Sequence, residues 1–368
     1  MGQPNSPEDG AKFAKPAPLV GLDLYNRGAP LWTRAFLKDV QAQINEDVPE
    51  FVIHYIDTTI GLKQNEAHKK PERWHTKVMF FGYRHTVGFR HATSTGLQGS
   101  AFNPQCASYW ISQTCLDDPA NKKLLVSRYS VNRLDSLFKT AIHGWLSHEA
   151  RRKVVIPLFG TEISPTINKV ICFGLGNNLS VAFPYWTQHP AAISIRSAVR
   201  QKLGHKVRLL THYPNYTPDT KAVLERHKFE VMGKNGVDGF VEVDENSIVF
   251  VTSSDVPVTQ ILAELARPAI IITRSFKEVD LDWKCPVNTK KFYYRTLGSA
   301  DALDPDTPRT KAMFADYNAI PLWEGSGEEP RPWAPWLTTA MQVYIRKKDY
   351  KPKEVTRDDF ESWFEPYD

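Results

Sequence analysis

Residues 169–180 read Lys169-Val170-Ile171-Cys172-Phe173-Gly174-Leu175-Gly176-Asn177-Asn178-Leu179-Ser180, and this stretch decides the fold. Its four consecutive apolar residues, 170–173, are typical of a strand that is covered on both faces. The two glycines that follow, two positions apart, allow the backbone to turn sharply and to approach a bound group closely. The stretch therefore predicts a buried strand that runs into a ligand-binding turn of an α/β fold.

The segment that continues from this turn to Ile272 alternates short apolar runs with helical patterns of about ten residues. Strands are expected at 170–173, 207–210, 229–231, 247–251 and 269–272, and helices at 190–203, 218–227 and 257–265. Such alternation implies parallel strands that are joined by right-handed crossover connections. We therefore predict a three-layer, Rossmann-like α/β fold with a mostly parallel sheet and with extensions at both ends.

The chain outside this core is expected to form three further parts. They are a disordered tail at 1–19, a helical and irregular N-terminal extension at 20–160 that packs on the core at 161–275, and an aromatic-rich C-terminal extension at 276–368. In the first extension, Thr33 can cap a helix with apolar residues Phe36, Leu37, Val40 and Ile44. A second helix follows Asn132, with an apolar stripe formed by Leu134, Leu137, Phe138, Ile142, Trp145 and Leu146.

Further elements are expected on either side of the core. Residues 78–81 and 291–294 are strand-like, 341–345 is another expected strand, and 307–317 is a capped amphipathic helix. The apolar run at 154–159 is interpreted as an edge strand or as a lead-in to the core. The region around Trp333 and Trp336 is rich in proline and glycine, and its tryptophans either cover the flank of the core or bind a protein partner.

Bulk composition places the chain among folded proteins of a reducing compartment. The 368 residues are 42% hydrophobic, and 46 basic residues face 41 acidic ones, which predicts a mixed surface and no strong nucleic-acid signal. Four cysteines without a CxxC pair indicate a reducing environment. No stretch approaches the roughly 18 apolar residues of a membrane span. We therefore expect a cytoplasmic or nuclear protein.

The glycine turn fits no specific nucleotide motif. A dinucleotide fingerprint would need a third glycine where Leu179 stands, and a methyltransferase-type loop would need an acidic residue where Cys172 stands. The turn could still cradle a phosphate or an adenosyl group through backbone amides and a hydroxyl. The residues proposed for this role are Gly174, Gly176, Asn177, Asn178 and Ser180. The alternative, that the glycines only let the chain turn, stays open.

Two further loops are expected at the same edge of the sheet. The second strand is followed by Tyr213 without a carboxylate, which argues against recognition of a ribose diol, although the ring could stack on a base. The loop after the fourth strand contains Ser253, Ser254 and Asp255. These three residues could contact the ligand, but capping of the helix that begins near Pro257 is the favoured interpretation.

No catalytic or metal site follows from the sequence. His143 and His148 are five residues apart, whereas ligands on one helical face need a spacing of three or four. No G-x-S-x-G elbow supports a serine nucleophile. We therefore expect no metal and name no catalytic residue, and the identity of any cofactor is unknown.

A family resemblance rests on several motifs in order. They are Gly-Phe-Val-Glu-Val-Asp-Glu-Asn-Ser-Ile-Val-Phe at 239–250, Val-Pro-Val-Thr-Gln-Ile at 256–261, Ala-Arg-Pro-Ala at 266–269 and the glycine turn at 173–177. Together they resemble the fungal branch of the SRR-like (sensitivity to red light reduced) domain family over about residues 165–275, with weaker similarity at 24–44. Plant members are associated with circadian timing and light signalling, so the resemblance implies a regulatory protein whose biochemical activity is not settled.

The chain departs from the family pattern at two positions suited to chemistry. Tyr213-Pro214 stands where the family often has Asp-Pro, and Asp255-Val256-Pro257 stands where many non-fungal members have Pro-His-Cys. The leading hypothesis is therefore a regulatory protein with a small-molecule, nucleotide-like pocket. The first alternative is an adenosyl- or nucleotide-dependent transferase, which would need a carboxylate such as Asp219 or Asp238 near the turn. The second alternative is a protein-interaction scaffold.

Overall fold

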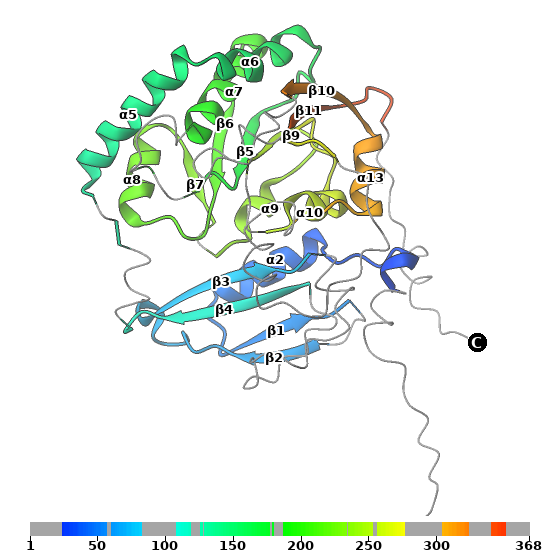
Figure 1. The fold of residues 1–368 in the computed structure, drawn as a ribbon. Coiled ribbons are helices and arrows are strands. Elements are labelled where there is room, and N and C mark those ends of the chain that lie inside the picture. The colour runs from blue at the N-terminus through cyan, green and yellow to red at the C-terminus, as the bar shows by residue number, and fades with distance from the viewer. Residues whose placement is uncertain are drawn as a thin grey trace, which may run out of the picture.

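The computed structural model describes most of the α/β core and parts of both extensions. The described residues are 24–56, 60–82, 108–118, 126–127, 129–176, 179, 187–233, 235–252, 256–276, 304–323 and 340–350. The expected tail at 1–19, the expected strand at 291–294 and the region of Trp333 and Trp336 lie outside them. Figure 1 shows the described elements in chain order.

A seven-stranded sheet forms the centre of the molecule. Its strands are β5 (Lys169–Phe173), β6 (Arg208–His212), β7 (Glu230–Met232), β8 (Ser247–Val251), β9 (Ile270–Arg274), β10 (Tyr317–Trp323) and β11 (Met341–Arg346), in the order β10-β11-β9-β8-β5-β6-β7. Strands β5 to β9 are parallel, whereas β11 is antiparallel to both β9 and β10. The mostly parallel α/β sheet predicted from the sequence is confirmed.

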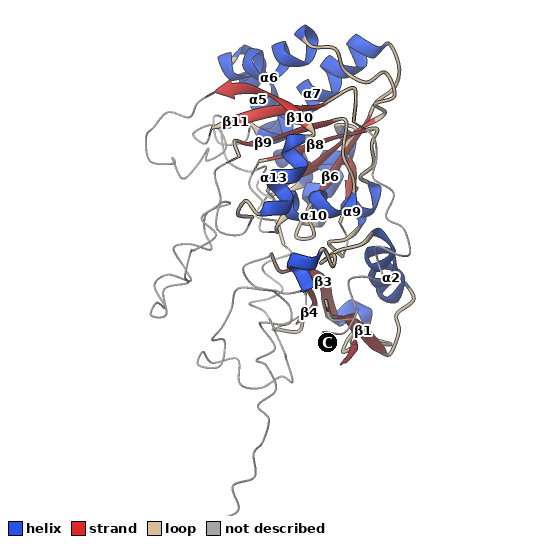
Figure 2. Ribbon diagram, turned by 90° about the vertical axis from the view of Figure 1, so that its right-hand side faces the viewer, coloured by secondary structure: helices blue, strands red, loops and turns tan. Residues whose placement is uncertain are grey.

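Helices cover both faces of this sheet, because its central strands are buried on both sides. One face packs against α5 (Val131–Ser147), α6 (Glu149–Gly160), α7 (Gln188–Leu203) and α8 (Pro218–Arg226). The other face packs against α9 (Asp238–Glu242), α10 (Val258–Leu265) and α13 (Pro308–Ala315). Alternate residues of one strand serve the two cores: Cys172 faces the first and Ile171 the second. Figure 2 shows the resulting three layers.

The N-terminal part lies against the second helix layer (Figure 2). It consists of α2 (Arg34–Asn45), the short 3-10 helix η1 (Pro71–Arg73), and two hairpins, β1 (Glu50–His54) with β2 (Ile60–Gln64) and β3 (Trp74–Phe80) with β4 (Tyr109–Cys115). As predicted, Thr33 caps α2, and its Oγ1 accepts a hydrogen bond from the Phe36 amide at 3.1 Å. Among the hydrogen bonds that join this part to the core, the Trp32 amide donates to Glu264 and the Val78 amide donates to the Asn235 carbonyl.

The structure corrects three sequence predictions. The run 154–159 lies in helix α6 and is no strand, because Val154 and Leu158, four apart, are buried while Ile156 and Phe159 are exposed. Leu146, assigned to the apolar stripe of α5, is 48% exposed. The helix expected to reach residue 317 ends at Ala315, and Tyr317 begins β10, which the sequence analysis did not predict. Strands β10 and β11 thus continue the central sheet beyond residue 275.

Candidate functional site at the carboxyl edge of the sheet

The glycine turn lies at the tip of β5. The strands that follow β5 in the chain lie on both sides of it, with β6 and β7 on one side and β8 and β9 on the other. The chain leaves β5 through α7 to reach β6 on one side, whereas β8 pairs with β5 on the other side. Ligands of open α/β sheets bind at such a reversal of strand order, outside the carboxyl ends of the strands. The carboxyl edge between β5 and β8 is therefore the candidate site.

The backbone of the turn is held to the tip of β8. Gly174 and Gly176 have φ angles of 72° and 76°, a left-handed conformation that side chains disfavour. The Thr252 hydroxyl donates a hydrogen bond to the Gly174 carbonyl at 2.7 Å, and its amide donates to the Phe173 carbonyl at 3.3 Å. Of the remaining predicted ligand residues, Asn177, Asn178, Ser180, Ser253, Ser254 and Asp255 lie outside the described residues.

The tip of β6 carries a histidine that the sequence analysis did not single out. His212 is 4% exposed, and its Nδ1 accepts a hydrogen bond from the Gly239 amide at 3.1 Å. Burial lowers the pKa of His212 to about 4, although Asp238 and the Gly236 backbone act in the opposite direction. The ring is therefore neutral at pH 7 and fixes the first turn of α9 to the sheet. Tyr213, which follows it, packs edge-on against Tyr216 at a ring distance of 5.2 Å.

A buried polar chain connects β6 with the first turn of α7. The Tyr216 hydroxyl lies 2.8 Å from Thr211 Oγ1 and 3.1 Å from His189 Nε2. Burial lowers the pKa of His189 to about 3, so this ring is neutral as well. Within the described residues, His189 Nδ1 and Gln188 Oε1 are buried without a hydrogen-bond partner. Such atoms in a native structure call for a water or a ligand group.

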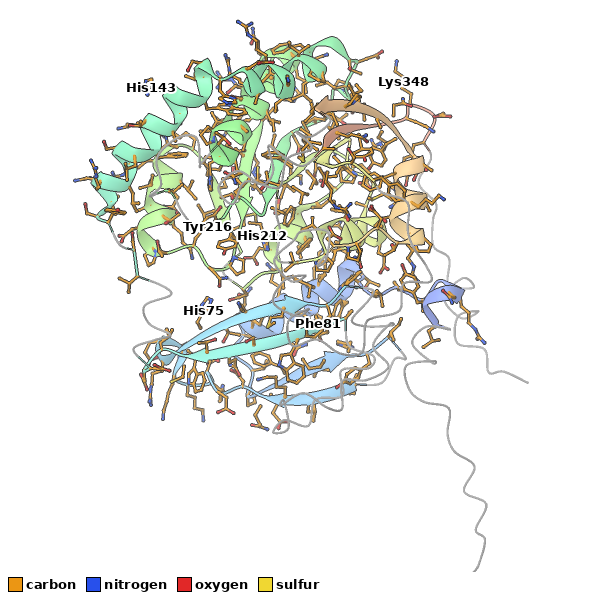
Figure 3. All side chains as sticks on the ribbon, in the orientation of Figure 1. His75, Phe81, His143, His212, Tyr216 and Lys348 are labelled. Carbon is orange, nitrogen blue, oxygen red and sulfur yellow. The ribbon has the colours of Figure 1, made fainter. Side chains whose placement is uncertain are left out.

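The hairpin of β3 and β4 adds a third histidine beside this edge. Figure 3 shows His75 on the N-terminal part, opposite Tyr216 and His212 at the lower edge of the sheet. His75 interacts with Asn215, and its Nε2 is buried without a hydrogen-bond partner among the described residues. Burial lowers the pKa of His75, which the hydrogen bond to Asn215 counteracts. Three of the histidines near this edge thus favour the neutral form.

The two carboxylates considered for a transferase do not reach the glycine turn. Asp238 accepts hydrogen bonds from the Gly233 amide and from the Gln41 side chain. Asp219 lies in the first turn of α8. In the described part of the chain, neither carboxylate is hydrogen-bonded to Gly174 or Gly176. The sequence prediction that the second strand lacks a carboxylate at its tip agrees with the His212-Tyr213 tip of β6.

The helix after β8 is capped from a distant segment. The predicted cap residues of α10, Ser254 and Asp255, lie outside the described residues, and its N-cap residue Pro257 makes no side-chain capping bond. Asp304 accepts hydrogen bonds from the Thr259 amide at 2.7 Å and the Gln260 amide at 3.3 Å. Burial raises the pKa of Asp304 to about 6, which the charge of Arg274 counteracts. The sequence did not indicate this cap, because Asp304 lies 45 residues after Thr259.

The described residues contain neither a metal-binding cluster nor a membrane-spanning helix. No cluster of three or more histidine, cysteine or carboxylate side chains there could hold a metal ion. None of the described helices is both long enough and apolar enough to span a membrane. Cys172 is a free thiol in β5, and burial raises its pKa, so it belongs to the core.

Comparison with known proteins points to one family. The SRR1 domain model matches residues 138–345, from within α5 almost to the end of β11, which is more than half of the chain. An O-methyltransferase family protein from Burkholderia thailandensis is similar at 12% identity, with 63% of this chain and 68% of that chain covered and a TM-score of 0.29. A Burkholderia thailandensis 1,6-didemethyltoxoflavin-N1-methyltransferase is similar at 13% identity, covering 60% and 89%, with a TM-score of 0.26. No curated protein matches.

Proposed function

The chain belongs to the SRR1 domain family, and from this premise we propose that it is a regulatory protein that binds a small, nucleotide-like molecule at the carboxyl edge of its sheet. The observation that carries this proposal is the turn at Gly174 and Gly176, with two left-handed glycines at the reversal of strand order. Its backbone is fixed by Thr252, so the turn is preorganised for a ligand.

The first turn of α7 indicates the chemistry of the ligand. The amino end of a helix carries unpaired amides and a partial positive charge, both of which favour a phosphate or carboxylate. This end of α7 also holds the two unpartnered atoms of Gln188 and His189. Because β6 ends in His212 without a carboxylate, the usual acceptor for ribose hydroxyls is missing. An anionic group at the turn is therefore the expected anchor.

The ionisable groups near the turn favour binding over catalysis. A general base works best with a pKa near the operating pH and with access to its substrate. His212 and His189 are buried, and burial lowers their pKa values to about 4 and about 3. Both rings are also hydrogen-bonded to groups of the protein. These histidines therefore support the site as structural residues.

A thermal-shift screen against nucleotides, adenosyl cofactors and phosphates tests this proposal. A ligand at 100 times its Kd should stabilise the chain by about 2.7 kcal/mol. Gly176→Ala should abolish this stabilisation. Gly204→Ala is the matched control, because Gly204 has a similar φ of 74° and no heavy atom within 4 Å of an added Cβ, but ends α7 at its other end. If no compound stabilises the wild type at millimolar concentration, the proposal fails.

The strand order favours one second candidate, an adenosyl-dependent transferase. Counted from β5, the order is 3-2-1-4-5-7-6 with an antiparallel seventh strand, and its first five positions follow the 3-2-1-4-5 order of doubly wound nucleotide-binding sheets. Titration with S-adenosylhomocysteine distinguishes this candidate. It requires at least tenfold weaker binding in Gly176→Ala than in Gly204→Ala. Equal binding by the two variants, or no binding by the wild type, would exclude an adenosyl site at the glycine turn.

The finer expectations from the sequence belong to the same proposal. They are membership of the fungal branch, a role in the cytoplasm or nucleus, and the partition at residues 20, 161 and 276. A protein partner for the region of Trp333 and Trp336 is likewise proposed on sequence alone. Fractionation of the tagged full-length chain, followed by affinity purification, would test the location and the partner together.

A further inference from the structure

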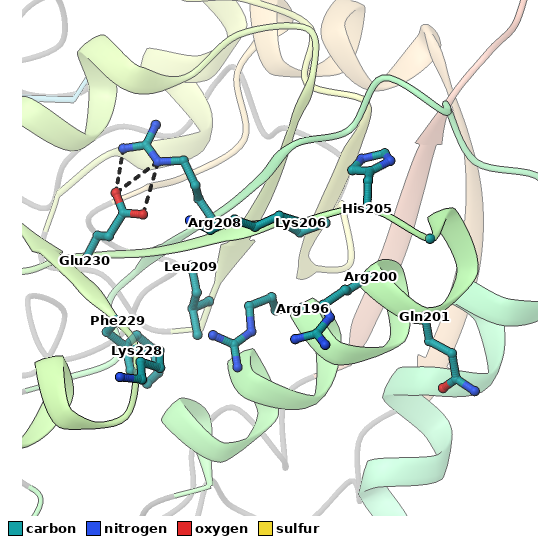
Figure 4. Close-up of a pocket in the computed structure, with 12 residues that line it drawn as sticks. Arg196, Arg200, Gln201, His205, Lys206, Arg208, Leu209, Lys228, Phe229 and Glu230 are labelled. Carbon is teal, nitrogen blue, oxygen red and sulfur yellow. Dashed lines mark hydrogen bonds and ion pairs between the residues drawn. The ribbon is translucent and has the colours of Figure 1, made fainter.

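A groove lies at the amino edge of the sheet, opposite the candidate site. It has a volume of about 820 Å³ and lies between the carboxyl-terminal half of α7 and the starts of β6 and β7. Cationic side chains dominate its lining: Arg196, Arg200, Lys206, Arg208 and Lys228, with Glu230 as the carboxylate among the residues that line it. Figure 4 shows these side chains.

The one lining carboxylate is already engaged. Arg208 donates from Nε and Nη2 to Glu230 at 2.6–3.1 Å and from Nη1 to Glu242 at 3.2 Å. Figure 4 shows Arg208 turned toward Glu230, away from the two α7 arginines. Within the described residues, neither of these arginines, nor Lys206 or Lys228, has a carboxylate partner. Among the described residues, the groove therefore carries four positive charges without a paired carboxylate.

Two of these charges lie close to each other. Arg196 and Arg200 are one turn apart on α7, and like charges at this spacing destabilise a helix. Arg196 is half-buried, and burial followed by the charge of Arg200 lowers its pKa. The negative end of the α7 dipole accounts for a cation in the last turn. It accounts neither for Arg196, one turn earlier, nor for Lys228, which lies between α8 and β7.

We propose that this groove is a binding site for a compact polyphosphate, a molecule with two or more phosphate groups. Guanidinium forks bind phosphate oxygens in pairs, and an ammonium group adds a point charge. The adjacent guanidinium groups of Arg196 and Arg200 would take one phosphate, and Lys206 and Lys228 would take another. Binding would relieve the repulsion between the arginines and supply the missing counter-charge.

The observations favour a small ligand over a nucleic acid. The volume lies within the range of small-molecule sites. Single-stranded nucleic acids also need exposed aromatic rings for base stacking, whereas Phe229 in this lining is 3% exposed. The His205 ring in the lining is held by a hydrogen bond to the Ile167 carbonyl at 2.8 Å. The chain as a whole has 46 basic and 41 acidic residues, so no extended basic field would follow a phosphate backbone.

Calorimetric titration of the full chain with tripolyphosphate tests the proposal. Arg196→Gln/Arg200→Gln should bind about 100-fold more weakly, because two charge-assisted contacts are lost. Lys228→Gln, at an exposed residue, should bind about tenfold more weakly and serves as a second variant should the double variant fold poorly. Arg133→Gln/Arg152→Gln is the matched control, since both are exposed arginines on α5 and α6 without an ion-pair partner among the described residues. It should bind like the wild type.

Several outcomes would overturn the proposal. They are the absence of tripolyphosphate binding at millimolar concentration, an equal loss in the control variant, and tighter binding of a single-stranded oligonucleotide that depends on the same two arginines. Binding no stronger than that of orthophosphate would also exclude a site for several phosphates. Because the groove and the glycine turn lie at opposite edges of the sheet, Gly176→Ala should retain tripolyphosphate binding, which separates this test from that of the proposed function.

Discussion

At the carboxyl edge of the sheet, polar side chains such as His212 and Asp304 are buried and hydrogen-bonded to the protein. At the amino edge, Arg196 and Lys228 line a groove without a carboxylate partner among the described residues. Removing a polar side chain that is hydrogen-bonded within the folded protein lowers the free energy of unfolding. Removing a side chain without such a partner should weaken ligand binding and leave the free energy of unfolding almost unchanged. Substitutions at the two edges therefore separate structural residues from ligand residues.

The largest effect should come from Asp304→Ala at the carboxyl edge. This substitution removes two charge-assisted capping bonds to α10, whereas the ion pair of Arg274 with Asp306 remains. We expect a loss of about 3–5 kcal/mol in the free energy of unfolding, measured by urea denaturation, because each lost hydrogen bond involves a buried charged group. Asp349→Ala, at an exposed residue, is the control and should change it by less than about 0.5 kcal/mol. A loss below about 1 kcal/mol for Asp304→Ala would break the comparison.

The next effect is a pH dependence that arises from His212. Its pKa of about 4 in the folded chain lies below the ordinary 6.5, so the unfolded chain binds more protons between these values. Stability is therefore lost as the pH falls from 6.5 to 4, by roughly 3 kcal/mol. His212→Asn, which keeps an acceptor for the Gly239 amide, should lose this dependence.

The difference between the wild type and this variant is the quantity to measure. Asp304, whose pKa is raised to about 6, gives a pH dependence of opposite sign to that of His212. Its contribution to the free energy of unfolding falls as the pH rises through 6. Subtracting the urea-unfolding profiles of wild type and His212→Asn removes that contribution. The same substitution at His143, exposed on α5 (Figure 3), should retain the wild-type profile. Identical profiles for wild type and His212→Asn would contradict a buried neutral ring.

Gly239→Ala should have a somewhat smaller effect at the same edge. An added Cβ would lie 2.6–2.7 Å from Nδ1, Cβ and Cγ of His212, which is too close for an unchanged structure. We expect a loss of about 2 kcal/mol by urea denaturation, from overpacking. Gly160→Ala, where no heavy atom lies within 4 Å of the added Cβ, is the control and should be neutral or slightly stabilising. An unchanged free energy of unfolding in Gly239→Ala would show that α9 can move away from His212 without loss of stability.

Local patterns in the sequence predicted the central strands and two helix caps. The apolar runs of β5 and β8 and the caps at Thr33 and Thr307 are complete within a few residues, so no tertiary information was needed. Strand β10 follows α13 after one residue, and the analysis extended the helix across it. In α6 the same few apolar residues fit both a helix and a strand, and only packing decides between them.

The site could be predicted only in part for a related reason. The position of the glycine turn follows from its own residues, but its neighbours are set by strand order. Asp304 reaches Thr259 from a segment 45 residues away, and His212 meets Gly239 from 27 residues away. The groove likewise joins Arg196 to Lys228 across two elements. No spacing rule in the sequence encodes such pairs.

The smallest expected effect is the one that most directly tests the comparison, because two arginines of one groove should differ. Arg208→Gln removes a two-pronged ion pair that is about 40–50% exposed, and should cost roughly 0.5–1 kcal/mol by urea denaturation. Arg196→Gln removes no such pair and relieves repulsion from Arg200, so it should change stability by less than about 0.5 kcal/mol, in the stabilising direction. If Arg196→Gln lowered the free energy of unfolding more than Arg208→Gln, Arg196 would be a structural residue. The two edges would then not differ in the role of their polar side chains.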